Sequence, residues 1–272
     1  MLHKFSYVAP RSREELFSIL DQEQGAAKIL AGGTDLLVNI RNGVMKPRLV
    51  VDIKKVAGYQ GISYSPSDGL LFRPTVTINE ILRDPAVKEH YPLFQECAHD
   101  LASYQVRNRA TIMGNVVNAS PCSDMAPALL CMGAQAIIAS SAGTRVIPFS
   151  QFFRGVKRTV LAPNEVLEAI QVPAAAADGR GAYKKLKRIS GHDLGIVGVA
   201  VYIKGDTLRI AVSSAAPTPV VTPDLSDSIS IEEAITETRK ITSPISDVRC
   251  SKEYREFMIG IFVKRLLQEV RT

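Results

Sequence analysis

Apolar positions in the first 55 residues alternate between helical and extended spacing. The run Ser12-Arg13-Glu14-Glu15 has the form of a capping box, in which a Ser oxygen accepts from the backbone N–H three residues on and the Glu side chain bonds back. It predicts a helix whose apolar face starts at Leu16. Apolar runs at 26–31 and 49–51 predict strands beside this helix. The segment is therefore predicted to be a compact unit of the βαβ type.

The same alternation continues on a larger scale between residues 56 and 175. A second capping box, Thr77-Ile78-Asn79-Glu80, predicts a short helix that Pro85 curtails, because proline lacks the N–H that a helix interior needs. Another helix is expected to begin near Met125 and to end at Gly133, since glycine often follows a helix end. The other predicted elements are a strand at 70–72, a helix at 93–101 and a hairpin of residues 136–139 and 145–147.

A stretch of small residues at 173–181 predicts a surface connection and a domain boundary. Beyond it, β-branched runs at 197–203 and 208–212 predict a hairpin, and the capping box Ser230-Ile231-Glu232-Glu233 opens the first of two helices. The second helix is expected to pack through an apolar stripe of Tyr254, Phe257, Met258, Ile261, Phe262 and Leu266. We predict an α+β chain with a domain at 1–175, divided into subdomains of about 1–55 and 56–175, and a second domain at 176–272.

Composition narrows the class of protein. The chain has 272 residues, 46% of them apolar, which is enough to bury a core. It has no run of roughly 18 apolar residues that could span a membrane, and its first residues lack the apolar run of a signal peptide, so a soluble, cytoplasmic protein is expected. There are 33 Lys and Arg against 27 Asp and Glu, a net charge of +6. Because the basic residues are dispersed, nucleic-acid binding is not predicted, whereas an anionic ligand and an acidic partner both remain open.

Most catalytic signatures are missing. The four cysteines are sparse and irregularly spaced, so neither a disulfide framework nor a metal or cluster site is predicted. The sequence has no HExxH, GxSxG, P-loop or GxGxxG motif, and its four histidines are isolated. We therefore assign no catalytic residue and no metal ligand.

Two segments are rich in glycine and in small polar residues, a composition that suits a binding loop better than a helix or a strand. The first, Ile29 to Leu36, runs from an apolar strand into Gly32-Gly33 and the hydroxyl residue Thr34. The backbone N–H groups of such a turn can converge on an anion. A Gly-Gly turn of this kind can also serve only to reverse the chain. The second, Arg109 to Asp124, offers hydroxyl and amide groups directly before a helix. Asp124 is either the N-cap of that helix or a carboxylate for sugar hydroxyls. Together the two segments suggest a diphosphate clamped between loops.

The pair Ala31-Gly32-Gly33-Thr34-Asp35 and Thr111-Ile112-Met113-Gly114-Asn115 resembles the AGG(T/H)(D/S) and TIGGN motifs of the FAD-binding subunit of molybdenum hydroxylases, the xanthine dehydrogenase and aerobic carbon monoxide dehydrogenase family. The resemblance implies a two-subdomain FAD-binding domain of the para-cresol methylhydroxylase type, followed by a C-terminal domain of an antiparallel sheet and helices. It covers nearly the whole chain, through Asn118–Pro121, Asp124–Leu130, Leu161–Leu167, Tyr183–Arg188, and Asp247–Arg249 before Tyr254-Arg255.

The resemblance also implies site residues. Asp124 would hold ribose hydroxyls, and Leu194 would lie near the flavin ring. Lys184 would be near the cofactor, although Lys185 and Lys187 compete for the same alignment. Met113 departs from the family, which commonly has Gly there, and this puts the geometry of the turn in question. The FAD diphosphate would be held by Ile29, Leu30, Ala31, Gly32, Gly33, Thr34, Asp35 and Leu36 with Thr111, Met113, Gly114 and Asn115, and the adenine would be lined by Leu101 and Leu167.

The implied function is electron transfer within a multi-subunit oxidoreductase. In the family scheme a large subunit carries the molybdenum cofactor, a small subunit carries [2Fe–2S] clusters, and FAD exchanges electrons with NAD or another acceptor. The chain lacks the cysteine-rich insertion that some relatives use for an extra cluster. Two alternatives stay open: a scaffold subunit that has lost FAD, and a stand-alone flavin oxidoreductase. With the diphosphate held by backbone N–H groups, the surplus positive charge is assigned to surfaces that meet partner subunits.

Overall fold

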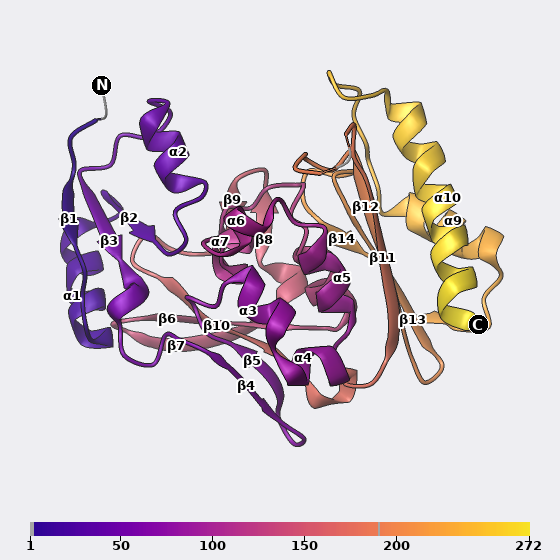
Figure 1. The fold of residues 1–272 in the computed structure, drawn as a ribbon, viewed down its shortest axis with the longest axis horizontal. Helices are drawn as coiled ribbons and strands as arrows, with labels where there is room; N and C mark the ends of the chain where they lie inside the picture. The colour runs from indigo at the N-terminus through magenta and orange to yellow at the C-terminus, as the bar shows by residue number, and fades with distance from the viewer. Residues whose placement is uncertain (1–2, 190) are drawn as a thin grey trace.

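The computed structural model describes residues 3–189 and 191–272. A three-stranded sheet, a five-stranded sheet and a second five-stranded sheet follow one another along the chain and lie in that order across the molecule (Figure 1). A small two-stranded sheet completes the set among the described residues. This is an α+β fold with an antiparallel C-terminal sheet, as the sequence predicts.

The N-terminal unit is a parallel sheet of order β1-β3-β2 with helices in its connections. Ser12 caps its first helix by accepting from the backbone N–H of Glu15 at 3.1 Å. The Glu15 side chain accepts from the N–H of Arg11 instead of Ser12, so the expected capping box is incomplete. The elements are β1 (Ser6–Val8), α1 (Arg13–Glu23), β2 (Ala27–Leu30), α2 (Leu36–Arg41), β3 (Leu49–Asp52) and the 3-10 turn η1 (Ile53–Lys55).

The middle unit is an antiparallel sheet of order β4-β5-β10-β6-β7 with short helices packed beside it (Figure 1). The capping box at Thr77 and Glu80 is complete, and Pro85 opens the next helix after ending this one. The elements are β4 (Ile62–Ser65), β5 (Gly69–Phe72), α3 (Ile78–Arg83), α4 (Pro85–His90), α5 (Leu93–His99), α6 (Tyr104–Arg107), α7 (Ile112–Val117), α8 (Ala126–Cys131), β6 (Gln135–Ser140), β7 (Gly143–Pro148), η2 (Phe149–Gln151), β8 (Phe153–Gly155), β9 (Arg158–Thr159) and β10 (Val166–Val172).

The C-terminal unit is a sheet of order β11-β12-β13-β14, with β15 also paired to β13 and with α9 and α10 on its outer face (Figure 1). The Ser230 capping box is complete. In the last helix, Tyr254 and Phe257 are exposed, so the apolar stripe predicted from spacing is wrong at these two positions. The elements are η3 (Ala174–Ala176), β11 (Arg180–Leu186), β12 (Val197–Lys204), β13 (Thr207–Ser213), β14 (Val220–Val221), β15 (Leu225–Ser226), α9 (Ile231–Lys240) and α10 (Lys252–Arg271).

The middle and C-terminal units share one hydrophobic core. Helices α5 and α8 pack on the face of the C-terminal sheet opposite to α10, so β12 is covered on both faces and is buried from Val197 to Ile203. The connection at 173–181 takes part in this packing: Ala176 and Ala177 are buried in the same core, so it is not the free surface segment that its composition predicts. No helix in the described part of the chain is long and apolar enough to cross a membrane.

Candidate functional site

The loop after β2 presents a row of backbone donors. Gly33 has a φ of +79°, and a Cβ on Gly32 would lie 2.0 Å from the carbonyl oxygen of Arg109, so neither position accommodates a side chain. Within residues 3–189 and 191–272, the five successive N–H groups from Gly32 to Leu36 have no hydrogen-bond acceptor. Such a set of free donors suits a bound anion with several oxygens.

The second loop lies against the first. Thr111 caps α7, since its Oγ1 accepts from the N–H of Gly114 at 2.9 Å. At the other end of α7, Asn118 donates from Nδ2 to Oδ1 of Asp35 at 2.8 Å and accepts from Nζ of Lys157 at 2.9 Å. The two loops singled out in the sequence are thus brought together, by backbone contact at Gly32 and by a side-chain hydrogen bond at Asp35.

Met113 points into the protein. Its side chain belongs to the central hydrophobic core and is 3% exposed. The side chain at the position where the resemblance implies glycine is therefore accommodated in the core and does not cover the loop surface.

Asn115 connects α7 to the segment that carries Asp124. Its Oδ1 accepts from Oγ of Ser123 at 2.6 Å and from the N–H of Met125 at 3.3 Å. The hydroxyl of Ser123 accepts from the N–H of Ala126 at 3.3 Å. Asp124 does not cap α8: its carboxylate is used elsewhere, so the N-cap interpretation is wrong.

Asp124 forms a buried ion pair with Lys185. Nζ of Lys185 lies 2.8 Å from Oδ1 of Asp124, and the two side chains are 2% and 11% exposed. The hydroxyl of Tyr183 donates to the same oxygen at 3.3 Å. Burial raises the pKa of the Asp124 carboxyl, although Lys185 opposes this effect.

Of the three candidate lysines, Lys184 faces away from Lys185 and Lys187, because side chains alternate along a strand; the side chains of Lys185 and Lys187 both reach Asp100. Lys185 and Tyr183 share the face of β11 that meets Asp124. Lys184 points to the opposite face and pairs with Glu269 of α10. Lys187 pairs with Asp100. The structure thus brings Lys185, and not Lys184, to the carboxylate at the site.

The remaining predicted residues fall into two groups. Leu101 and Leu167 are buried in the central core, 5% and 2% exposed. Leu194 is 60% exposed. Its neighbour Gly195 packs on the Lys185 side chain, because a Cβ on Gly195 would lie 3.3 Å from Cε of Lys185. The loop carrying Leu194 therefore borders the Asp124–Lys185 pair.

Sequence reasoning did not assign Asn118, Tyr183 or Gly195 to the site. Tyr183 lies two residues before Lys185 in β11 and so shares its face, but no strand was predicted there, so the sequence did not reveal this relation. Gly195 could not be found in this way, because its contact with Lys185 depends on the path of the loop.

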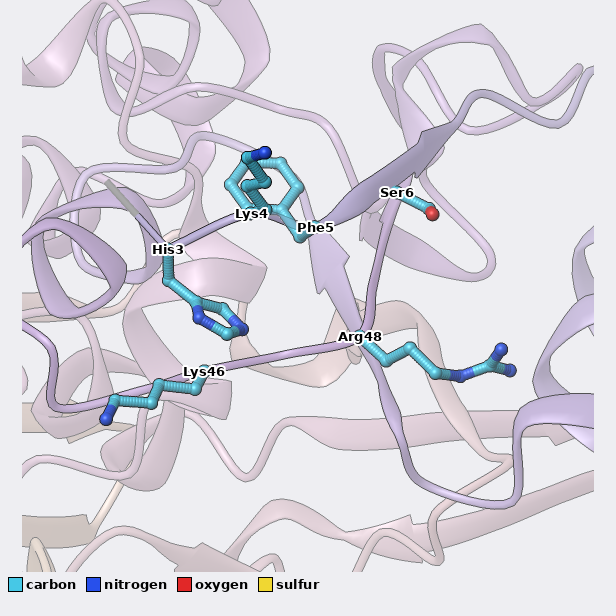
Figure 2. A pocket seen from close by; sticks show the side chains of 6 residues that line it. All are labelled: His3, Lys4, Phe5, Ser6, Lys46 and Arg48. Carbon is cyan, nitrogen blue, oxygen red and sulfur yellow. The ribbon is translucent and has the colours of Figure 1, made fainter. Parts of the chain in front are cut away.

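A separate hollow of about 470 Å³ lies at the start of β1 and the segment before β3 (Figure 2). It contains none of the predicted site residues. Positively charged side chains dominate its lining, which consists of His3, Lys4, Phe5, Ser6, Lys46 and Arg48. All four cysteines are free; Cys97 and Cys131 are buried, and Cys122 and Cys250 are half-buried.

Comparison with known proteins covers both parts of the chain. Residues 3–175 match the family described as the FAD binding domain in molybdopterin dehydrogenase, and residues 181–270 match the CO dehydrogenase flavoprotein C-terminal domain. The carbon monoxide dehydrogenase medium chain of Hydrogenophaga pseudoflava is 32% identical, over 97% of this chain and 96% of its own length. A putative xanthine dehydrogenase FAD-binding subunit of Escherichia coli is 30% identical, over 89% and 88%.

Solved structures agree over the whole length. Carbon monoxide dehydrogenase from Hydrogenophaga pseudoflava superposes with a TM-score of 0.92 at 32% identity, covering 99% of this chain and 98% of that one. Quinoline 2-oxidoreductase from Pseudomonas putida 86 gives a TM-score of 0.88 at 26% identity, with 99% and 98% covered.

Proposed function

The chain belongs to the family of FAD-binding subunits of molybdenum hydroxylases, and we propose that it passes electrons between the [2Fe–2S] clusters of a partner and an external acceptor such as NAD. When bound, FAD supplies the redox chemistry, because it accepts and releases the electrons. The protein's own contribution is to bind the cofactor, orient it and set its surroundings.

The main observation that supports FAD binding by this chain is the row of free N–H groups from Gly32 to Leu36. A diphosphate placed on it would receive donors from the first loop and from Thr111–Asn115 of the second. The two loops are held together by the close approach of Gly32 to Arg109, just before α7, and by the Asp35–Asn118 hydrogen bond at the end of α7. The main-chain donors make the binding independent of side-chain charge.

Further contacts are proposed for the rest of the cofactor. Asp124 would accept hydrogen bonds from sugar hydroxyls, with Lys185 as the lysine at the cofactor. Leu194 would lie beside the flavin ring. Leu101 and Leu167 have buried side chains, so we propose that they reach the adenine through their main chain.

The proposed partners are a large molybdenum-cofactor subunit and a small [2Fe–2S] subunit. The names of the relatives support this, since several are medium chains or subunits. The surplus positive charge, including the hollow around Lys46 and Arg48, would serve subunit contacts. The division at 1–175 and 176–272, and a cytoplasmic location, belong to the same proposal.

Purification from the native source tests the proposed assembly. We expect a small iron–sulfur chain and a large molybdenum chain to co-purify with this protein. Anaerobic addition of NADH to the complex should bleach the flavin absorption if NAD is the acceptor. A chain that purifies alone and whose flavin is bleached directly by an organic substrate would instead be a stand-alone oxidoreductase.

A further inference from the structure

Residues Asp247 to Arg249 form a turn whose two charged side chains point inward. The Asp247 N–H donates to the carbonyl of Cys250 at 3.1 Å, which closes the turn, and Val248 between the charges is 97% exposed. Arg249 binds Asp247 through two nitrogens, Nε at 3.0 Å and Nη2 at 2.6 Å. Hydrogen bonds from Arg249 hold the pKa of Asp247 well below its usual value, so the carboxylate stays charged.

The third nitrogen of Arg249 reaches out of this pair. Its Nη1 donates to the carbonyl oxygen of Gly195 at 3.1 Å and to Sγ of Cys122 at 3.4 Å. Gly195 follows Leu194, and Cys122 lies two residues before Asp124. One guanidinium group therefore joins the C-terminal turn to both segments that border the proposed flavin site.

Arg255 on α10 adds to the contact between the Asp247–Arg249 turn and the Gly195 segment. It is 1% exposed, and its Nη2 lies 2.8 Å from Oδ1 of Asp247. Its Nη1 donates to the carbonyl of Ser214 at 2.9 Å and to that of Ile196. The carbonyls of Gly195 and Ile196 are thus held by the two arginines that flank one carboxylate.

Most other hydrogen bonds of this loop are made within it or with β11. Asp193 accepts from the N–H of Leu194 at 2.8 Å and from Arg188, whose hydrogen bonds lower the pKa of Asp193 to about 2. The Ile196 N–H donates to the carbonyl of Leu186 at 2.8 Å. These bonds shape the loop within itself and tie it to β11. The Cys122 thiol also donates to the Gly195 carbonyl oxygen, at a long 3.7 Å, and Arg249 Nη1 binds both of these groups.

We propose that Arg249 is a positioning residue of the FAD site: together with Asp247 and Arg255 it fixes the Gly195–Ile196 backbone against Cys122 and so holds Leu194 beside the flavin ring. The inference rests on the proposed function. Removing the guanidinium releases the loop without touching the Gly32–Leu36 donors. The flavin's surroundings should then change while its diphosphate anchor remains.

The test compares Arg249→Gln with a matched control, Arg209→Gln, in the full chain. Arg209 also binds a carboxylate through two nitrogens, to Asp224 at 2.5 and 3.2 Å, and donates to a carbonyl of the middle unit, that of Cys131, at 3.3 Å. It lies on β13 and has no contact with Gly195 or Cys122 among the described residues. The control therefore removes the same kind of arginine–carboxylate pair and carbonyl hydrogen bond, at another contact between the middle and C-terminal units.

Two measurements decide the outcome. Hydrogen exchange of the amides at 194–196 should speed up in Arg249→Gln and not in Arg209→Gln. If the loop holds the binding geometry in about one tenth of the Arg249→Gln molecules, the Kd for FAD rises about tenfold. The visible circular dichroism of the bound flavin should change as well. Arg249→Lys, which keeps the charge but not the planar fork, should show the same changes to a smaller degree and serves if the Gln variant does not fold.

Unchanged exchange at 194–196 overturns the proposal. So does faster exchange with wild-type FAD affinity and flavin spectrum, which would make Arg249 merely structural. Failure of the proposed function looks different: the wild-type chain itself would take up no FAD, whatever the variants do. The link to the flavin is then refuted, while exchange still shows whether Arg249 holds the loop.

Discussion

Replacing Lys185 with Met tests the buried ion pair at the proposed cofactor site. At 2.8 Å, and with an effective dielectric constant of about 20, the attraction between Lys185 and Asp124 is about 6 kcal/mol, and desolvation of both charges offsets part of it. Removing one partner leaves a buried carboxylate without its cation. We expect Lys185→Met to lower the free energy of unfolding by about 3–5 kcal/mol.

A second substitution separates this effect from a packing defect. Adding Asp124→Asn removes the uncompensated charge, and the amide oxygen can still accept from Tyr183. The double variant should therefore be more stable than Lys185→Met alone. Urea unfolding of the wild type, both single variants and the double variant gives the coupling energy, measured without added FAD because a bound ligand raises the apparent stability. Costs that simply add would refute the ion-pair interpretation.

The dependence on pH has a definite sign. Burial raises the folded-state pKa of Asp124, so its stability contribution is fully present below the unfolded pKa of about 3.9 and is lost as the pH rises through the folded pKa. Without Lys185 this pKa rises further. The deficit of Lys185→Met should therefore shrink as the pH is lowered from about 7 towards about 4. A deficit that is constant over this range contradicts the proposed cause.

Two further predictions use the backbone and the thiols. Gly33→Val should sharply reduce FAD content, because a side chain there strains the loop and blocks the approach to its N–H groups. The control Gly43→Val changes a glycine with a similar φ of +74° and open space around it, so it should lose stability and keep FAD. Equal FAD content in the two variants would show that the first loop is not part of the site. In the native chain a thiol reagent at neutral pH should leave Cys97 and Cys131 unmodified, because both are buried and burial raises the pKa of both thiols. For Cys131 the pKa is raised to about 12. Modification of all four cysteines before the protein unfolds would contradict this packing.

Local signals predicted local structure well. The capping boxes at Thr77 and Ser230 form as expected because their partners are three residues apart. Ser12 caps its helix, but Glu15 finds the N–H of Arg11. Helical spacing did not show that Tyr254 and Phe257 lie outside the buried face, because the spacing does not say where that face is centred.

Long-range contacts explain what sequence reasoning missed at the site. The two glycine-containing loops could be paired through their resemblance to one family, and they do meet. Choosing between Lys184 and Lys185 required the orientation of β11, which α10 and Asp124 determine from opposite sides. The contact of Arg249 with Cys122 joins residues 127 positions apart and has no local signal.

Acid extraction of the purified wild-type chain tests the central claim most directly. The account predicts a yellow protein with a flavin absorption spectrum that releases FAD, and not FMN, in a ratio of about one per chain, as expected for a single row of donors at Gly32–Leu36. A colourless chain that also takes up no added FAD would contradict the account.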